Sequence, residues 1–324
     1  MELSLVIPVY NGEKYIEECI RSVLTSEVDK SKIEIVIIDD GSTDNSVSIC
    51  NKYTSENFKV YCNSNHGVSY SRNFGVNVSN GKWIMFIDAD DKLSYNWYSI
   101  VSKYFNSNED IVTFSNKVEK IPDEKVEILK NIVGINNDVK NLASPWSKMY
   151  RKNFLQDNKI TFYQDIINGE DMLFNINCFL NTQKYKFVED NIYEYRIHNN
   201  SATRKFNDSF IKYDLNFQNR LAEILNCSEI SNEQKSIIIS FCKKNSLIII
   251  AQRMCYGGKY TLFKKNKYIF DEYFRTCRSK VNLGIKKESI IFLLRIKCYF
   301  GVYLILSLIK KMKKDNKTSY FVNI

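Results

Sequence analysis

The stretch Trp83-Ile84-Met85-Phe86-Ile87-Asp88-Ala89-Asp90-Asp91 runs five mostly apolar residues directly into three carboxylates. The apolar run predicts a buried strand whose carboxyl end carries the acidic residues. Side chains alternate along an extended chain, so Asp88 and Asp90 can point the same way. Neighbouring carboxylates repel each other unless a cation lies between them, and oxygen ligands of this kind suit Mg²⁺ or Mn²⁺ bound with a substrate's phosphates. The alternative is a solvated acidic turn, which the motif taken alone favours.

Alternating strand and helix patterns extend outward from this stretch over about the first 115 residues. Amphipathic helical patterns separate five short apolar runs, which predict strands at 3–9, 33–38, 58–62, 83–87 and 111–114. This order predicts a Rossmann-like α/β fold, with a mainly parallel sheet flanked by helices and joined by right-handed crossovers.

Polar clusters follow four of the predicted strands. They are Pro8-Val9-Tyr10-Asn11, Asp39-Asp40, Asn65-His66-Gly67 and Asp88-Ala89-Asp90. Ligands of such sheets bind beyond the carboxyl ends of the strands, so all four clusters are expected at one edge. Four polar clusters at one edge of a sheet are far less probable by chance than any one of these motifs alone.

The chain is long enough for one large domain or two smaller ones, at 324 residues. We expect an α/β domain at 1–210, a helical extension at 211–280 and a basic amphipathic helical tail at 281–324. The polar region 119–143 predicts a variable loop region. Nine scattered cysteines without a Cys-x-x-Cys pair, and only two histidines, argue against a zinc site. No charged-then-apolar leader precedes the first strand, so we expect no cleaved secretion signal.

The net charge of +9 is concentrated near the C-terminus. Between Lys286 and Lys314, eight cations and one anion leave a net charge of +7. These cations interrupt an apolar run, which argues against nucleic acid as a partner. Arg295 and Lys297 lie inside the run and cost about 2.5–3.5 kcal/mol each in a bilayer core, which makes a spanning helix doubtful. We expect a helix lying at the membrane surface against anionic headgroups, and a packed helix with a solvated lysine tail is the alternative.

Some residues near the predicted edge can be interpreted either as ligand-binding residues or as parts of a turn, a helix cap or a solvated surface. Asp40 can accept from a nucleobase or ribose, or can belong to an Asp-Gly turn with Asp44 as the helix cap. Asn65, with Gly67 and Arg72 at the start of a helix, can hold anionic groups, and a solvated arginine is the alternative.

Two further clusters lie beyond the strand-and-helix repeat. Glu170 and Asp171 begin an amphipathic helix, where acidic residues usually serve as caps, but a carboxylate there can also act as a general base. His198, flanked by Arg196 and Arg204, can cover a diphosphate or complete a metal shell, although a lone histidine is more often structural.

Taken together, these motifs resemble the inverting glycosyltransferases of family 2, which have the GT-A fold. The likeness covers roughly 1–205 and fades beyond. The matching strings are Val6-Ile7-Pro8-Val9-Tyr10-Asn11, Ile37-Ile38-Asp39-Asp40-Gly41-Ser42-Thr43-Asp44, Asn65-His66-Gly67-Val68-Ser69-Tyr70-Ser71-Arg72-Asn73-Phe74-Gly75, Phe86-Ile87-Asp88-Ala89-Asp90-Asp91, Trp146-Ser147-Lys148-Met149-Tyr150-Arg151 and Gly169-Glu170-Asp171.

The resemblance implies a role for each candidate residue. Asp171 is the catalytic base, with Glu170 beside it at the substrate, and Asp90 and Asp88 are metal ligands for Mn²⁺ or Mg²⁺. His198 matches a position near the diphosphate and the metal. The resemblance places Pro8, Tyr10 and Asp40 in the nucleoside pocket, and Asn65 and Arg72 at the base and phosphates.

The resemblance also implies the partners and the setting. The donor is a nucleotide-diphosphate sugar, a UDP-sugar before others, and the acceptor is a glycan or lipid-linked glycan. A role in surface polysaccharide synthesis is the family-level expectation. The odd number of irregularly spaced cysteines indicates reduced thiols in a cytoplasmic protein, and the basic C-terminal helix indicates a place at the inner face of the cell membrane.

Other classes fit the residues less well. A sugar-nucleotide pyrophosphorylase is expected to carry a Gly-rich, Arg-containing loop after the first strand, and a dehydrogenase a Gly-x-Gly-x-x-Gly motif there. That loop is Tyr10-Asn11-Gly12-Glu13-Lys14. In a non-catalytic sugar-binding protein, we would expect residues of the acidic motifs to be replaced, but these motifs are intact.

Overall fold

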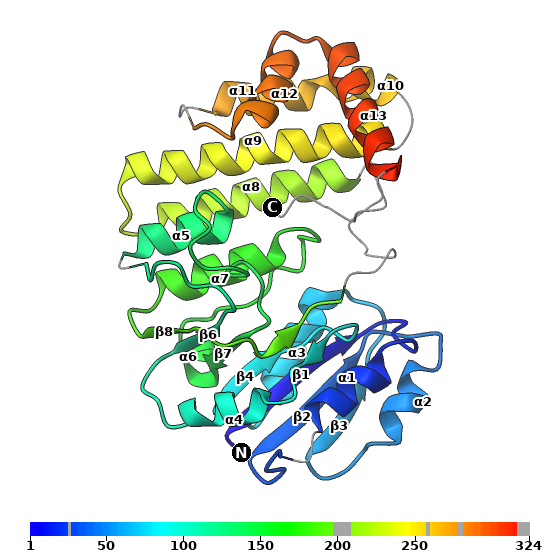
Figure 1. Cartoon of the computed structure of the whole chain (residues 1–324), viewed down its shortest axis with the longest axis vertical. Coiled ribbons are helices and arrows are strands. Elements are labelled where there is room, and N and C mark those ends of the chain that lie inside the picture. The colour runs from blue at the N-terminus through cyan, green and yellow to red at the C-terminus, as the bar shows by residue number, and fades with distance from the viewer. Residues whose placement is uncertain (25–26, 123, 197–208, 257–259, 278–280, 316–324) are drawn as a thin grey trace. The chain divides into compact units, whose positions relative to one another are not determined.

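The computed structural model describes residues 1–24, 27–122, 124–196, 209–256, 260–277 and 281–315. The chain forms two compact units (Figure 1). The first unit comprises 1–132, 136–164 and 169–198, and the second comprises 133–135, 165–168 and 199–324.

A seven-stranded sheet forms the centre of the first unit, in the order β3-β2-β1-β4-β7-β6-β8. Neighbouring strands pair in parallel except at β7, which runs antiparallel to both β4 and β6. The predicted mainly parallel sheet flanked by helices is therefore confirmed. Its strands are β1 (Leu3–Val9), β2 (Ile33–Asp39), β3 (Phe58–Cys62), β4 (Trp83–Phe86), β6 (Ile111–Phe114), β7 (Lys148–Arg151) and β8 (Tyr185–Val188).

The strands have the apolar composition that burial on both faces requires. Every residue of β2 and β4 is buried. The helix α3 lies so close to β1 that a side chain at Gly75 would collide with Val6, so this position needs glycine. The helical elements of this unit are α1 (Ile16–Val23), α2 (Ser46–Asn51), α3 (Val68–Val78), α4 (Trp97–Val101), the 3₁₀ turn η1 (Ser102–Tyr104), α5 (Lys125–Val133, all but its last residue), α6 (Lys152–Asp157) and α7 (Glu170–Leu180).

A second, two-stranded sheet connects distant parts of the chain. Lys92–Leu93 (β5) pairs antiparallel with Tyr193–Glu194 (β9). This pairing brings the segment after β8 beside the acidic turn that follows β4.

The prediction of a loop region at 119–143 is wrong for the middle of that segment. Residues Lys125–Val133 form α5, on which Ile128, Leu129 and Ile132 are buried. These residues form a short apolar stripe at helical spacing. The polar residues around the stripe dominate the composition of the segment and hide this pattern.

The second unit is helical, so the predicted C-terminal helical region is confirmed. Leu247, Phe270, Ile291 and Val302, each from a different helix, lie in one core cluster. The predicted boundaries at 210 and 280 stay predictions. In the described part of the chain, no helix combines the length and the apolar character needed to cross a bilayer. The helices are α8 (Ser209–Asn226), α9 (Asn232–Tyr256), α10 (Thr261–Lys265), α11 (Lys267–Thr276), α12 (Ile285–Arg295) and α13 (Tyr299–Asp315).

Candidate active site

Hydrogen bonds join the loops that follow β1, β2 and β3. Asn11 Oδ1 accepts from the backbone N–H of Thr43 at 2.8 Å. Asp40 Oδ1 accepts from His66 N at 2.8 Å, and Asp40 Oδ2 accepts from Gly67 N at 2.7 Å. Three of the four polar clusters that were predicted at one edge are therefore linked to one another by hydrogen bonds.

The buried Asp40 fixes the loop that carries Asn65. Pro8, before the end of β1, is half-buried. Tyr10 and Asn65, in the loops after β1 and β3, are exposed. The predicted contacts of these residues with a nucleoside stay predictions. The neighbouring Asp39 has a buried Oδ1 without a hydrogen-bond partner among the described residues, and no role was predicted for that carboxylate.

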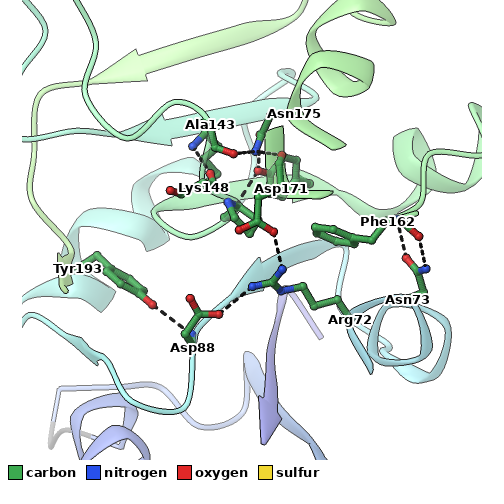
Figure 2. A network of polar contacts seen from close by, with 12 residues as sticks. Arg72, Asn73, Asp88, Ala143, Lys148, Phe162, Asp171, Asn175 and Tyr193 are labelled. Atoms are coloured by element: carbon green, nitrogen blue, oxygen red, sulfur yellow. Dashed lines mark hydrogen bonds and ion pairs between the residues drawn. The ribbon is translucent and has the colours of Figure 1, made fainter. Parts of the chain in front are cut away.

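Arg72 joins the two acidic motifs (Figure 2). Its Nη2 lies 2.9 Å from Asp88 Oδ1, and its Nη1 lies 2.5 Å from Asp171 Oδ1. The arginine side chain is 4% exposed, while those of Asp88 and Asp171 are 30% and 32% exposed. The sequence predicted all three residues but not this bridge, and the predicted contact of Arg72 with phosphates stays a prediction.

Phe162 supports the guanidinium of Arg72. The ring centroid lies 5.1 Å from Arg72 Cζ, and the ring stacks on Phe174 of α7 with 3.9 Å between centroids. Asn73 fixes the Phe162 backbone through two hydrogen bonds, from Asn73 Nδ2 to Phe162 O and from Phe162 N to Asn73 Oδ1 (Figure 2). The bridge therefore rests on a packed aromatic pair, which limits the movement of Arg72.

Burial sets the protonation of the Glu170-Asp171 pair at the start of α7. It raises the pKa of Asp171 above its ordinary value, while the charge of Arg72 lowers it and that of Asp88 raises it. Burial, followed by the charge of Asp171, also raises the pKa of Glu170, which is 9% exposed. Asp171 thus combines a raised basicity with a partly exposed carboxylate.

Asp91 shapes the acidic turn after β4. The buried carboxylate accepts from Tyr193 Oη at 2.7 Å and from Arg196 N at 2.8 Å. Tyr193 Oη also accepts from Asp88 N at 3.1 Å, so one hydroxyl holds both ends of the turn. Burial raises the pKa of Asp91 to about 7. The sequence left Asp91 without a role, and nothing local indicated that β9 would supply its partner.

The oxygen ligands at this turn fit a divalent cation held jointly with a substrate. Asp88 and Asp90 are half-buried, in contrast to Asp91. Mg²⁺ typically binds one or two protein carboxylates together with phosphate oxygens and waters. Among the described residues, no three His, Cys, Asp or Glu side chains are grouped as a complete protein metal site. The third predicted ligand, His198, lies outside the described residues.

Lys148 fixes the loop that precedes β7. Its side chain is fully buried, and Nζ donates to Asn141 O at 2.9 Å and to Ser144 O at 2.6 Å. Burial lowers the pKa of Lys148 to about 7. No role for this lysine could be predicted from the sequence, because its partners are backbone carbonyls that carry no side-chain signal.

The same loop contacts both acidic motifs. Asn175 Nδ2 donates to Ala143 O at 2.8 Å and to Asp171 O at 3.1 Å, which connects the loop to α7 (Figure 2). Trp146 stacks on Tyr193 with 4.5 Å between ring centroids and 8° between planes. Ala143 and Trp146 therefore connect this loop to the two acidic motifs through Asn175 and Tyr193.

The sequence profile described as "Glycosyl transferase family 2" matches residues 4–168. The chain belongs to glycosyl transferase family 2. The profile covers the four polar edge loops and the Trp146-Ser147-Lys148 loop, and it ends just before the Glu170-Asp171 pair.

Curated bacterial glycosyltransferases resemble this family 2 chain. "Uncharacterized glycosyltransferase EpsJ" of Bacillus subtilis (strain 168) is 30% identical over 222 residues, which are 62% of each chain. "Poly(ribitol-phosphate) beta-N-acetylglucosaminyltransferase TarS" of Staphylococcus aureus (strain MW2) is 28% identical over 203 residues, or 60% of this chain and 35% of TarS. The likeness thus spans less than two thirds of either relative.

Solved structures of S. aureus TarS share the fold. The structure of its residues 1–349 in complex with UDP-GlcNAc superimposes with a TM-score of 0.71 at 20% identity, covering 100% of this family 2 chain and 94% of that one. Another crystal structure of the same fragment gives a TM-score of 0.69 at 20% identity. The family 2 chain therefore has the GT-A fold, with a C-terminal helical region.

Proposed function

We propose that this chain transfers a hexosyl group from a nucleotide-diphosphate donor to an acceptor hydroxyl, with inversion and with a divalent metal. The carrying observation is the bridge from Asp171 through Arg72 to Asp88. It joins the candidate base to the candidate metal ligand in one supported network. Family membership supports the reaction class.

Asp171 suits the role of general base. One of its oxygens is held by Arg72, and its side chain is 32% exposed, so an acceptor hydroxyl can reach the carboxylate. Its raised pKa increases its affinity for the hydroxyl proton, while Arg72 keeps it ionised. The hydroxyl attacks the anomeric carbon as Asp171 takes its proton, and a single displacement inverts the configuration.

Asp88 and Asp90 suit the diphosphate side of the reaction. They would hold Mn²⁺ or Mg²⁺, and the bound cation would neutralise the charge that develops on the departing nucleoside diphosphate. Arg72 adds a fixed positive charge next to the same turn. Asp91 is occupied by Tyr193 and Arg196 and serves the shape of the turn.

A UDP-sugar is the donor that the comparisons favour. One TarS structure is a complex with UDP-GlcNAc, and TarS is described as an N-acetylglucosaminyltransferase acting on poly(ribitol-phosphate). For this chain we infer a glycan or lipid-linked glycan acceptor and a place in the synthesis of a surface polysaccharide.

A donor screen tests this proposal. Purified protein is incubated with UDP-, GDP- and dTDP-sugars, and release of nucleoside diphosphate is measured with Mn²⁺, with Mg²⁺ and after chelation by EDTA. We expect metal-dependent release from a UDP-sugar. Tight binding of a sugar nucleotide without any release, in the presence of glycan acceptors, would instead support a non-catalytic binding protein.

A further inference from the structure

Large apolar side chains are exposed along α12 and α13 of the second unit. We call the following six residues the apolar face: Ile285, Phe292, Ile296, Phe300, Leu304 and Leu308. Their exposure ranges from 45% at Leu304 to 88% at Ile285. Phe300, Leu304 and Leu308 recur every four residues, so they form one stripe of α13.

The opposite sides of both helices already form the core. Ile291 and Leu294 of α12, and Val302 and Leu306 of α13, are almost fully buried in the cluster that includes α9 and α11. These helices are therefore apolar on two sides, whereas a helix at a protein surface normally has one apolar stripe. Within the apolar face, Phe300 meets Tyr260 edge-on with 5.6 Å between ring centroids, but the exposed surface of all six side chains lies outside the buried core.

Exposed cations accompany the apolar face. Lys286 and Arg295 lie on α12, and Lys311 follows Leu308 on α13. The one anion in this basic segment, Glu288, pairs with Lys244 of α9 at 3.0 Å, and the segment keeps a net charge of +7. Apolar side chains with adjacent Lys and Arg match a bilayer interface, where acyl chains and anionic headgroups lie next to each other.

We propose that the apolar face and its cations bind the surface of an anionic lipid bilayer, with α12 and α13 lying in the interface. This would hold the protein at the inner face of the cell membrane, and it does not depend on the proposed transferase activity. The cations distinguish lipid from a second copy of the chain, since pairing two such faces would bring like charges together. An interface location also agrees with the charged residues that interrupt the apolar run.

Flotation with vesicles tests the proposal on the full chain. Phosphatidylcholine vesicles are compared with vesicles in which about a third of the lipid is phosphatidylglycerol. We expect binding to the anionic vesicles that weakens as salt increases, because exposed charges are screened. Lys286→Gln with Lys311→Gln should weaken binding about 25-fold, since each cation near an anionic surface contributes about 1 kcal/mol, or about fivefold. Lys52→Gln with Lys103→Gln removes the same charge from exposed positions of the first unit and should change binding less than twofold.

The apolar part of the face needs its own variants. Phe292→Gln, Leu304→Gln and Leu308→Gln combined should abolish flotation, and glutamine keeps a good helix former at each position. Tyr268→Gln, at an exposed position of α11, is the control and should bind like the wild type. Equal binding by the triple variant and the wild type, with unchanged circular dichroism, would overturn the proposal.

A fluorescence measurement keeps the proposal testable if the triple variant does not fold. The chain has three tryptophans, all in the first unit, so Leu308→Trp adds a reporter on the apolar face. We expect its emission to shift to the blue with anionic vesicles and to be quenched by brominated acyl chains, unlike that of Ile121→Trp. Emission already shifted in buffer, without a response to vesicles, would mean that a second copy or another segment of the chain covers the face, and would overturn the proposal.

Discussion

Arg72 Nη1 lies 2.5 Å from Asp171 Oδ1, although 99 positions separate the two residues in the chain. The arginine extends from α3, next to the parallel half of the sheet, whereas Asp171 lies in the first turn of α7. Through its second amino group, Arg72 also holds Asp88. The buried guanidinium of Arg72 therefore fixes the distance between the candidate base, Asp171, and the acidic turn that carries the candidate metal ligand Asp88.

Replacing Arg72 by lysine should disrupt this bridge. An ammonium is a point charge and cannot make the two directed contacts of a planar guanidinium. We expect kcat/KM for sugar transfer to fall about 100-fold or more, because misplaced catalytic groups are costly. Arg21→Lys, which alters an exposed ion pair on α1, is the matched control and should retain full activity. Wild-type kinetics in Arg72→Lys would show that the bridge does not position the base.

The acid limb of the pH–rate profile should lie above the ordinary titration range of aspartate. Asp171 must be ionised to accept a proton, and burial raises its pKa. Activity should therefore be lost as pH falls through that raised pKa. Because Arg72 lowers the pKa of Asp171, the residual activity of Arg72→Met should have its acid limb at still higher pH. An unmoved limb in this variant would contradict the assignment of the limb to Asp171.

Tyr193→Phe should loosen the acidic turn without removing a carboxylate. The variant leaves the buried Asp91 Oδ2 and the Asp88 N–H without their shared hydroxyl partner. We expect a loss of about 1–3 kcal/mol in the free energy of unfolding, and about tenfold weaker activation by Mn²⁺. Tyr95→Phe, at an exposed position, should change neither quantity. Unaltered Mn²⁺ activation in Tyr193→Phe would mean that the turn holds its shape without this hydroxyl.

Lys148 should give the free energy of unfolding a distinctive pH dependence. Its pKa is about 7 in the folded protein and ordinarily about 10.5, so between these values the unfolded chain binds more protons. The wild type should therefore gain stability relative to Lys148→Met as pH rises from 7 to 9, by at most about 1.4 kcal/mol per pH unit. Urea unfolding of both proteins at pH 7, 8 and 9 measures this difference. A constant difference would show that Lys148 is not titrating as a buried amine.

The sequence predicted the parallel part of the fold because its strands are continuous apolar runs ending in polar loops. It missed β7 and β8, in which lysine or arginine interrupts the apolar residues, and β7 ends in the partly exposed Arg151. It also missed α5, where three buried residues are surrounded by polar ones. Apolar periodicity is informative only when a run is long enough to rise above its neighbours.

The candidate site was predictable as a set of residues but not as a network. Local motifs identified Asp88, Asp171 and Arg72, and the sheet topology explained why the edge loops meet. The partners of Asp91 and Lys148 come from β9 and from backbone carbonyls, which depend on tertiary pairing. No pattern near either residue in the sequence encodes those contacts.

Asp171→Asn tests the central claim most directly. Nucleoside diphosphate release from the preferred sugar nucleotide is measured with Mn²⁺ and acceptor, alongside the affinity for the donor. We predict a loss of about 10²–10⁴-fold in rate with donor affinity changed less than threefold, because the amide preserves shape but cannot accept the proton. Asp157→Asn, at an exposed position of α6, should match the wild type. Sugar transfer that survives Asp171→Asn undiminished would contradict the assignment of Asp171 as the base.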